Sequence, residues 1–457
     1  MPHGQRGRCR GGRHRRRPRD HRPRVTTGNR RGGAPGAHRR ARSRGEPGEP
    51  IVTSKDILAA EAAHILQTYK RAPIVFSRGS GVHLFDDSGQ AYTDLLSGIG
   101  VASLGHAHPG LAAAIADQAK TLVHTSNLYF HPLQGQLAAR LAELSGLPRA
   151  FFCNSGSEAV EACLKFARRY WHTAGDKTRS EVIALERSFH GRTLGALSTT
   201  WQPSYREPFQ PLVPGVTFVP AEADTLTAAI SSTTQAVIVE PLQGEGGIRP
   251  LPPEVARALQ QACDDTGALL IADEVQCGLG RTGHPFFFQA LDLRPDLISV
   301  GKALGAGFPV GAALVGDRVA AAVAYGDHGS TYGGNLLACR AALVFLEELM
   351  DHGLLDHVRT VGAIAQQRLR ALADRHAAIT DVRGAGVMWG IEVDAEAPEG
   401  ADVAAVATAA LERRLLVNRT AGNVVRLLPP LTITAEELGA ALDTLDTSFD
   451  SVLGGTS

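Results

Sequence analysis

The residues Asp296-Leu297-Ile298-Ser299-Val300-Gly301-Lys302 join a short apolar run to a glycine and a lysine, and the Gly-rich segment 303–307 follows. The apolar run predicts a buried strand, and the glycines predict a bend that brings the backbone close to another group. Burying an ammonium group is costly unless it is paired or neutral. A neutral lysine amine is the nucleophile of Schiff-base chemistry, whereas the structural alternative is a lysine that reaches solvent from the strand end.

Similar apolar runs recur on both sides of this stretch and alternate with segments of helical periodicity, such as residues 158–170 and 254–266. Continuous apolar strands that alternate with helices are typical of an α/β fold with a mostly parallel sheet covered on both faces. In such sheets ligands bind at the carboxyl ends of the strands. The predicted strands are 150–153, 181–185, 216–219, 236–239, 269–272, 297–300 and 310–315.

The two ends of the chain are predicted to share a second, smaller domain. A helical segment at 55–69 precedes short strand and turn signals up to residue 95, and helices at 341–349 and 357–373 precede strands at 386–393 and 424–428 and a last helix from 435. Neither part alone has enough apolar residues for a core. We therefore expect a tail at 1–50, the N-terminal part of a small α+β domain at 51–105, a large domain at 106–338, and the C-terminal part of the small domain at 339–457.

Charge is distributed unevenly along the 457 residues. Residues 1–50 hold 16 of the 47 basic residues and three of the 46 acidic ones, so the remainder, with 31 basic and 43 acidic residues, is acidic. The tail has almost nothing to bury and is expected to be disordered. Four interpretations of it stay open: a solvated tail, a nucleic-acid-binding arm, an Arg-rich transit peptide, or a true start of the protein near Val52. An acidic body makes nucleic acid an improbable partner.

Cysteine and histidine spacing predicts no metal site. The six cysteines form no CxxC pair, which favours reduced thiols in a cytoplasmic protein. His106 and His108 lack a nearby third ligand, so a role in a turn is favoured over a metal. No apolar run is long enough to span a membrane.

Four loops at predicted strand ends carry polar residues. The first three loops have structural alternatives: an ordinary helix cap for the first, a solvated arginine for the second, and a solvated acidic turn for the third. The fourth is the most informative, because Asp273 ends a fully apolar strand, where an unpaired carboxylate would be costly. The loops are Asn154-Ser155-Gly156-Ser157-Glu158, Ser188-Phe189-His190-Gly191-Arg192, Glu240-Pro241-Leu242-Gln243-Gly244-Glu245 and Asp273-Glu274-Val275-Gln276.

Together these features fit one small molecule. Asp273 precedes Lys302 by 29 residues, one strand–helix–strand step, so both are expected at the same sheet edge. The loop 154–158 opens a helix and can bind an anion, and Phe189 can stack on a flat ring. Pyridoxal 5′-phosphate requires a lysine for its aldehyde, an acid for its pyridinium nitrogen and an anion site for its phosphate.

With Gly301-Lys302-Ala303 and Gly329-Ser330-Thr331-Tyr332-Gly333-Gly334-Asn335, the four loops resemble the class-III (subgroup II) aminotransferases over residues 55–450. The resemblance implies the fold-type I architecture of pyridoxal-phosphate-dependent transferases and a transaminase activity. It is strongest to members that transfer the terminal amino group of N2-acetylornithine to 2-oxoglutarate in arginine biosynthesis.

The resemblance also implies residue roles. Lys302 would bond the cofactor and move a proton between substrate and cofactor carbons, and Asp273 would pair with the pyridinium nitrogen. Thr331 would reach the phosphate in a neighbouring subunit, which implies a homodimer. The remaining cofactor contacts would be the phosphate ligands Ser155, Gly156 and Ser157, the ring neighbours Phe189 and Val275, and Gln276 at the phenolic oxygen.

Substrate roles are implied for four further residues. Arg192 would bind the distal carboxylate of the acceptor, and Arg426 the α-carboxylate of glutamate. Glu245 would neutralise Arg426 when an ω-amine donor is bound. Ile99 stands where ornithine-specific members have tyrosine, which suits N2-acetylornithine or 4-aminobutyrate. Succinylornithine, a lysine precursor, ornithine, and an aminomutase or racemase reaction remain alternatives.

Overall fold

The computed structural model describes residues 53–394, 396 and 402–454. The tail at 1–50, with its four interpretations, lies outside them. A seven-stranded sheet dominates the middle of the chain, in the order β4-β12-β11-β10-β7-β5-β6. All neighbouring pairs in it are parallel except those that β12 makes with β11 and β4. Its strands are β4 (Arg149–Cys153), β5 (Glu181–Leu185), β6 (Val216–Val219), β7 (Thr234–Val239), β10 (Leu269–Asp273), β11 (Leu297–Val300) and β12 (Gly311–Val315).

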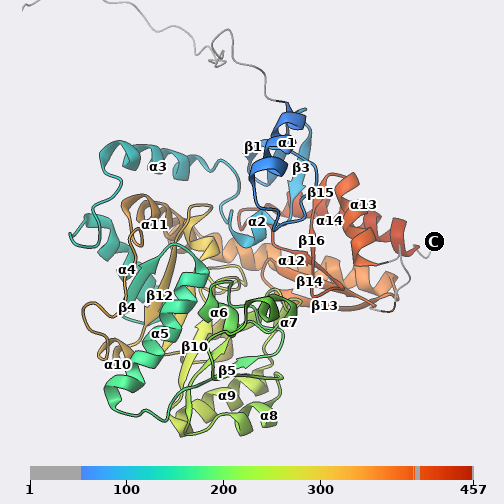
Figure 1. Cartoon of the computed structure of the whole chain (residues 1–457). Coiled ribbons are helices and arrows are strands. Elements are labelled where there is room, and N and C mark those ends of the chain that lie inside the picture. The colour runs from blue at the N-terminus through green and yellow to red at the C-terminus, as the bar shows by residue number, and fades with distance from the viewer. Residues whose placement is uncertain (1–52, 395, 397–401, 455–457) are drawn as a thin grey trace, which may run out of the picture. The chain divides into compact units, whose positions relative to one another are not determined.

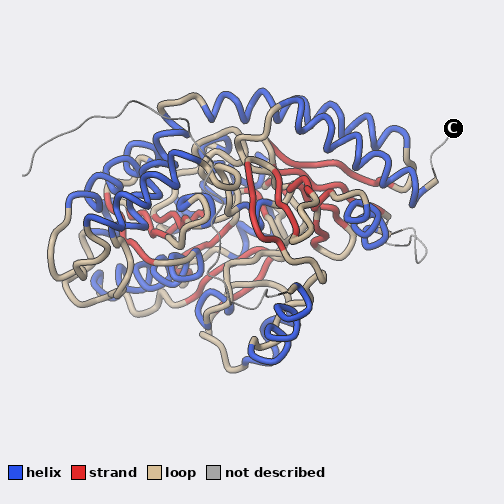
Figure 2. The backbone as a smooth tube through the Cα atoms, turned by 90° about the horizontal axis from the view of Figure 1, so that it is seen from above, coloured by secondary structure: helices blue, strands red, loops and turns tan. Residues whose placement is uncertain are grey.

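Alternate residues of these strands enter two different cores, which confirms a mostly parallel sheet buried on both faces. On one face, Leu269, Ile271 and Leu297 pack with Val160 and Phe166 of helix α5 (Gly156–Ala174). On the other face, the residues between them join a core that includes α4 and α9. Figure 2 shows the strands with helices on their outer sides.

Helices connect the strands of the large sheet. Most are short or amphipathic, with their apolar stripe turned to the sheet, as the helical periodicity predicts. They are α3 (Pro109–Thr121), α4 (Pro132–Ser145), α5, α6 (Leu194–Ser198), α7 (Pro203–Arg206), η1 (Glu207–Phe209), α8 (Ala223–Ala229), α9 (Pro253–Thr266), η2 (Phe287–Leu291), η3 (Lys302–Gly305), α10 (Asp317–Ala320) and α11 (Leu336–Met350), with a small β8–β9 hairpin (Leu242–Gln243 and Arg249–Pro250).

The early and late parts of the chain share sheets and contacts (Figure 1). Strands β1 (Phe76–Ser80), β2 (His83–Asp86) and β3 (Ala91–Asp94) form one sheet with β15 (Leu415–Leu416), which pairs in parallel with β3. A second sheet has the order β13-β14-β17-β16. The elements not yet given are α1 (Ser54–His64), α2 (Ser97–Gly100), α12 (Leu354–Arg375), β13 (Ile379–Ala385), β14 (Met388–Val393), α13 (Val403–Glu412), β16 (Asn418–Thr420), β17 (Val424–Leu427) and α14 (Ala435–Leu453).

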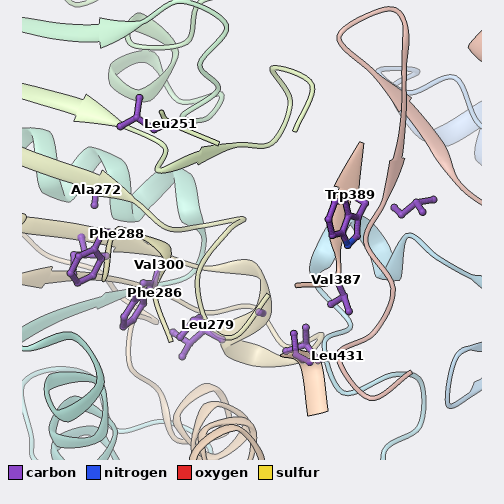
Figure 3. Packing of buried hydrophobic residues seen from close by; sticks show 14 of the residues in the cluster. Leu251, Ala272, Leu279, Phe286, Phe288, Val300, Val387, Trp389 and Leu431 are labelled. Atoms are coloured by element: carbon purple, nitrogen blue, oxygen red, sulfur yellow. The ribbon is translucent and has the colours of Figure 1, made fainter. Parts of the chain in front are cut away.

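Apolar residues from distant parts of the chain pack into one continuous core (Figure 3). The rings of Phe286 and Phe288 stack with centroids 5.9 Å apart, and Trp389 and Leu431 belong to the same core. The backbone N of Leu428 donates a hydrogen bond to the carbonyl oxygen of Leu95 (2.7 Å). This bond joins the chain after β17 to the segment before α2. The domain boundaries at residues 105 and 338 stay predictions.

Two smaller expectations have clear outcomes. The predicted helix at 55–69 ends earlier, at His64, and beyond it the Gln67 side chain donates to the carbonyl oxygens of Glu61 (3.0 Å) and Ile65 (2.6 Å). His106 bonds Asp94 through its Nε2 (2.8 Å), and His108 caps α3 by accepting from Leu111 N (3.2 Å), so both histidines have the predicted turn roles. Within the described ranges no cluster of three or more possible metal ligands occurs, and no helix is long and apolar enough to cross a membrane.

Candidate active site

Lys302 follows strand β11 through Gly301 and begins η3. A Cβ atom on Gly301 would lie 3.0 Å from the backbone N and Cα of Gly156, so glycine is required for this close approach. The removal of water from around its amine lowers the pKa of Lys302, and the carboxylates of Glu245 and Asp273 act in the opposite direction. No described residue forms a hydrogen bond with the Lys302 amine. This lowering of the pKa is a shift toward the neutral form that a nucleophilic amine requires.

Asp273 ends β10 beside Ser299 of β11 and is buried. One carboxylate oxygen bonds His190 Nδ1 (2.6 Å), and the other accepts from Ser299 Oγ (2.9 Å) and Val275 N (3.1 Å). The carboxylate that ends this apolar strand is therefore not unpaired, because an imidazole from the second loop bonds to it. These contacts fix the carboxylate at the same sheet edge as Lys302, as predicted.

The N-terminus of α5 forms one wall of the site. Ser155 is the N-cap, and its hydroxyl accepts from Glu158 N (3.3 Å). Gly156 must lack a side chain, because a Cβ there would lie 2.5 Å from Val275 Cγ1. First-turn N–H groups have no intrahelical acceptor, so those of Gly156 and Ser157 are available to an anion. The predicted phosphate ligands therefore share one helix end.

Phe189 is held by a buried acid from a third strand end. Glu240 follows β7 and accepts from Phe189 N and Gly244 N, each at 2.9 Å. Burial raises the pKa of Glu240 to about 7. The loops enclose a cavity of about 210 Å³. It is lined by Ser155, Gly156, Ser157, Phe189, His190, Gly191, Glu240, Asp273, Val275, Gln276 and Lys302.

Arg426 and Glu245 form an ion pair next to this cavity. Arg426 lies on β17 and is fully buried; its guanidinium also donates to Gln276 Oε1 (3.2 Å) and Asn418 Oδ1 (3.2 Å). Its Nη2 has no hydrogen-bond partner in the described part of the chain. Burial opposes ionisation of Glu245, but Arg426 outweighs it and keeps the pKa of Glu245 below its usual value. The predicted pair is therefore present and charged.

Glu245 and Arg426 do not line the cavity themselves, and three further predicted site residues belong neither to its lining nor to this ion pair. Arg192 is exposed, with its guanidinium carbon 3.6 Å from the centroid of the Tyr205 ring, and its backbone N donates to Ser157 Oγ (3.2 Å). Ile99 is 38% exposed and has a left-handed backbone (φ 65°) that is strained for a β-branched residue. Thr331 is exposed in the loop before α11.

Sequence reasoning missed the roles of His190, Ser299 and Glu240. Ser299 carried a signal, since it is the only polar residue in its predicted strand. Glu240 was visible as an acid after an apolar strand. His190 lies 83 residues before its partner Asp273, and nothing local in the sequence reveals that bond.

The aminotransferase class-III pattern matches residues 65–449. The chain belongs to this family. It is similar to an acetylornithine aminotransferase of Methanocaldococcus jannaschii, with 43% identity. The matched region covers 88% of this chain and 100% of that protein. The fold resembles the ornithine aminotransferase of Toxoplasma gondii (TM-score 0.82, 32% identity, 88% of this chain and 96% of that one). It also resembles an acetylornithine aminotransferase of Elizabethkingia anophelis (TM-score 0.77, 29% identity, 87% and 99%).

Membership of the class-III aminotransferases confirms three predictions: the fold-type I architecture, the transaminase class, and pyridoxal 5′-phosphate as cofactor. The residues fit this group, because the cavity combines a buried lysine amine whose pKa is lowered, a buried carboxylate and a helix end with free N–H groups. The roles of individual residues stay predictions.

Proposed function

We propose that this aminotransferase moves the terminal amino group of N2-acetylornithine to 2-oxoglutarate, which gives N-acetylglutamate semialdehyde and glutamate, a step of arginine biosynthesis. The observation that carries the proposal is the Glu245–Arg426 pair beside the Lys302 cavity. Relatives at 41–44% identity that bear the name acetylornithine aminotransferase support it.

The cofactor would be held by residues of several strand ends. Ser155, Gly156 and Ser157 would bind its phosphate, and Asp273 would face its ring nitrogen, oriented by His190 and Ser299. The group, when bound, supplies an electron-accepting ring that stabilises negative charge at the substrate carbon. Phe189 and Val275 would lie on the two sides of the ring, and Gln276 near its phenolic oxygen.

Lys302 is the proposed nucleophile and proton carrier. Burial lowers the pKa of this amine, which favours the unprotonated form that a nucleophile and a proton acceptor both need. Its position after Gly301, tight against Gly156, fixes where the proton is taken and returned. Asp273 does not share that task, because it would face the ring nitrogen, oriented there by its bonds to His190, Ser299 and Val275.

Arg426 and Glu245 would let one site accept two kinds of substrate. Glutamate brings an α-carboxylate, which a buried arginine binds bidentately. An ω-amine has no carboxylate beside its reacting amine, and an uncompensated buried charge would then be costly. The Glu245 carboxylate removes that cost by pairing with Arg426. Arg192 would bind the distal carboxylate of glutamate or 2-oxoglutarate and, in the other half-reaction, the α-carboxylate of the donor. Ile99 would leave room for the acylated amine of the donor.

A homodimer in the cytoplasm is the proposed form of the enzyme. Large apolar side chains are exposed in two segments, 128–130 and the loop that holds Thr331. Asn127 joins these segments, because its Nδ2 donates to Ser330 O (2.9 Å) and Gly333 O (3.0 Å). A second copy that covers this patch would bring Thr331 to the partner's cofactor phosphate. The exposed residues are Leu128, Tyr129, Phe130 and Tyr332. The five described cysteines are free and buried, which suits a reducing compartment.

The test is the absorbance of the cofactor-loaded enzyme while single amines are added without an oxo acid. N2-acetylornithine is expected to convert the cofactor band to its aminated form, and 2-oxoglutarate to restore it. A faster response to ornithine, succinylornithine or 4-aminobutyrate would transfer the proposal to that donor. Conversion of substrate without any need for 2-oxoglutarate would instead indicate a mutase or racemase.

A further inference from the structure

A second cavity, of about 780 Å³, lies between the loop after β5, helix α7, and the turn that joins β16 to β17. It touches Phe189 and Glu245 at its border but is lined by neither Lys302 nor Asp273. Tyr205 of helix α7 and Glu392 of strand β14 are both part of its lining. Three arginines from separate loops, Arg187, Arg249 and Arg419, line it together with the rings of Trp201 and Tyr205.

The arginines of this cavity are not fully compensated. The side chains of Arg187 and Arg419 are exposed and form no hydrogen bond or ion pair within the described residues. Arg249 pairs with Glu392 (3.1 Å) and donates to Gly246 O (3.2 Å). An excess of positive charge therefore lines the wall.

The two acids at the wall do not remove this excess. Glu245 pairs with Arg426, and Glu392 is shared between Arg249 and Arg383. Burial lowers the pKa of Arg249, and the neighbouring charges of Arg383 and Arg187 lower it further, while Glu392 opposes them. Like charges that crowd one concave wall attract a counter-ion.

We propose that this cavity is a binding site for a small anion with several carboxylate or phosphate oxygens, held by Arg187, Arg249 and Arg419. Arginine forks bind such oxygens bidentately, and three of them around one space favour a multivalent anion over a monovalent one. The site goes beyond the proposed reaction, because none of these three arginines has a role in that reaction, and it adjoins the active site at Phe189 and Glu245.

An anion here would contact the residues that support Glu245. Thr420 Oγ1, at the cavity wall, donates to the Glu245 carbonyl (2.7 Å), and Arg249 holds the next residue, Gly246. Binding is therefore expected to alter the rates without occupying the place of either substrate.

The experiment is calorimetric titration of the full-length, cofactor-loaded enzyme with citrate and, separately, with inorganic phosphate, at low ionic strength. The double variant Arg187→Gln/Arg419→Gln is expected to bind the tighter of the two anions at least tenfold more weakly than the parent. Arg370→Gln, which removes an exposed arginine of α12 without a described partner, is the matched control and is expected to bind like the parent. Comparison of the two titrations distinguishes carboxylate from phosphate recognition.

Kinetics separate this cavity from the active site. The anion is expected to change the rate without competing with N2-acetylornithine or 2-oxoglutarate, and the double variant is expected to lose that effect while its rate without anion stays the same. Equal affinity in parent and double variant, no binding of either anion, or purely competitive inhibition that persists in the double variant would overturn the proposal. None of these results depends on which amine is the donor.

Discussion

The two sides of the candidate active site are built differently. On the cofactor side, Asp273 has three hydrogen bonds, a Cβ on Gly156 would meet Val275, and a Cβ on Gly301 would meet the Gly156 backbone. On the substrate side, Arg192 is exposed and Ile99 is half exposed in a strained conformation. Contacts within one chain hold most of the cofactor side, whereas the substrate side combines the buried Arg426 with these less constrained residues. This difference suits an enzyme that binds two substrates in turn around one cofactor.

The largest expected effect is the loss of Lys302, the residue on which both sides depend. Lys302→Ala should lower turnover by roughly 10⁴-fold, because it removes the nucleophile and the proton carrier together. The cofactor should still bind, since the phosphate and ring contacts come from other residues. Steady-state rates and the absorbance of the protein after gel filtration measure both properties. Lys120→Ala, on the exposed face of α3, is the control, and normal turnover of Lys302→Ala would refute the assignment.

Removal of the charge of Asp273 should have the next largest effect. Asp273→Asn keeps the shape but loses the carboxylate, and an electrostatic contact of this kind contributes roughly 10²–10³-fold to turnover. Ser299→Ala, which removes only one bond to the same carboxylate, should lower turnover by less than about tenfold. Similar losses in the two variants would mean that the cofactor side depends on hydrogen bonding rather than on charge.

A change of Glu245 should affect the two half-reactions unequally. Glu245→Ala leaves Arg426 buried and uncompensated, so the half-reaction with N2-acetylornithine should slow by roughly 10- to 100-fold. The half-reaction with glutamate should change little, because its α-carboxylate pairs with Arg426 itself. Single-turnover absorbance measures each half separately, and Glu392→Gln is the control. Equal losses would count against a switchable pair.

Local features of the fold and the site could be predicted from the sequence, whereas features that depend on the folded sheet could not. The strands and the positions of Lys302 and Asp273 were predictable, because a charged residue that ends an apolar run is visible locally. The antiparallel direction of β12 was not, since hydrophobic periodicity carries no information about strand direction. Strand β13 was missed because its residues are mostly polar or half exposed. The bond between His190 and Asp273 depends on the folded sheet and is absent from any short stretch of sequence.

A change at Ile99 should alter specificity and little else. Tyrosine has no branch at Cβ, so it suits the left-handed backbone at least as well as isoleucine does. Its hydroxyl could bind the free α-amino acid head of ornithine. Ile99→Tyr should raise the ratio of kcat/KM for ornithine to that for N2-acetylornithine by about tenfold. An unchanged ratio would show that residue 99 does not contact the donor, and Ile99→Leu controls for the loss of branching alone.

The smallest effect on activity is expected from Glu274, which is next to Asp273 in sequence but belongs to the core. It is buried and accepts from Phe288 N (2.7 Å), and burial raises its pKa to about 7. An acid with a raised pKa in the folded state holds its proton there while the unfolded chain has already released it. Its contribution to stability is therefore largest below the unfolded value of 4.5 and falls as the pH rises to about 7. Glutamine stays neutral at every pH, so Glu274→Gln should gain stability relative to the parent over this range.

The expected gain of Glu274→Gln is at most roughly 3 kcal/mol between pH 4.5 and 7 and should level off above it. Denaturant unfolding of both proteins at a series of pH values measures this gain. Turnover is the second readout and should stay within about twofold, because the Glu274 side chain accepts from Phe288 N and does not line the Lys302 cavity. A difference in stability that does not vary with pH would mean that Glu274 is ionised in the folded protein. A large loss of turnover would mean that Glu274, although it packs in the core, helps to hold the cofactor side of the site.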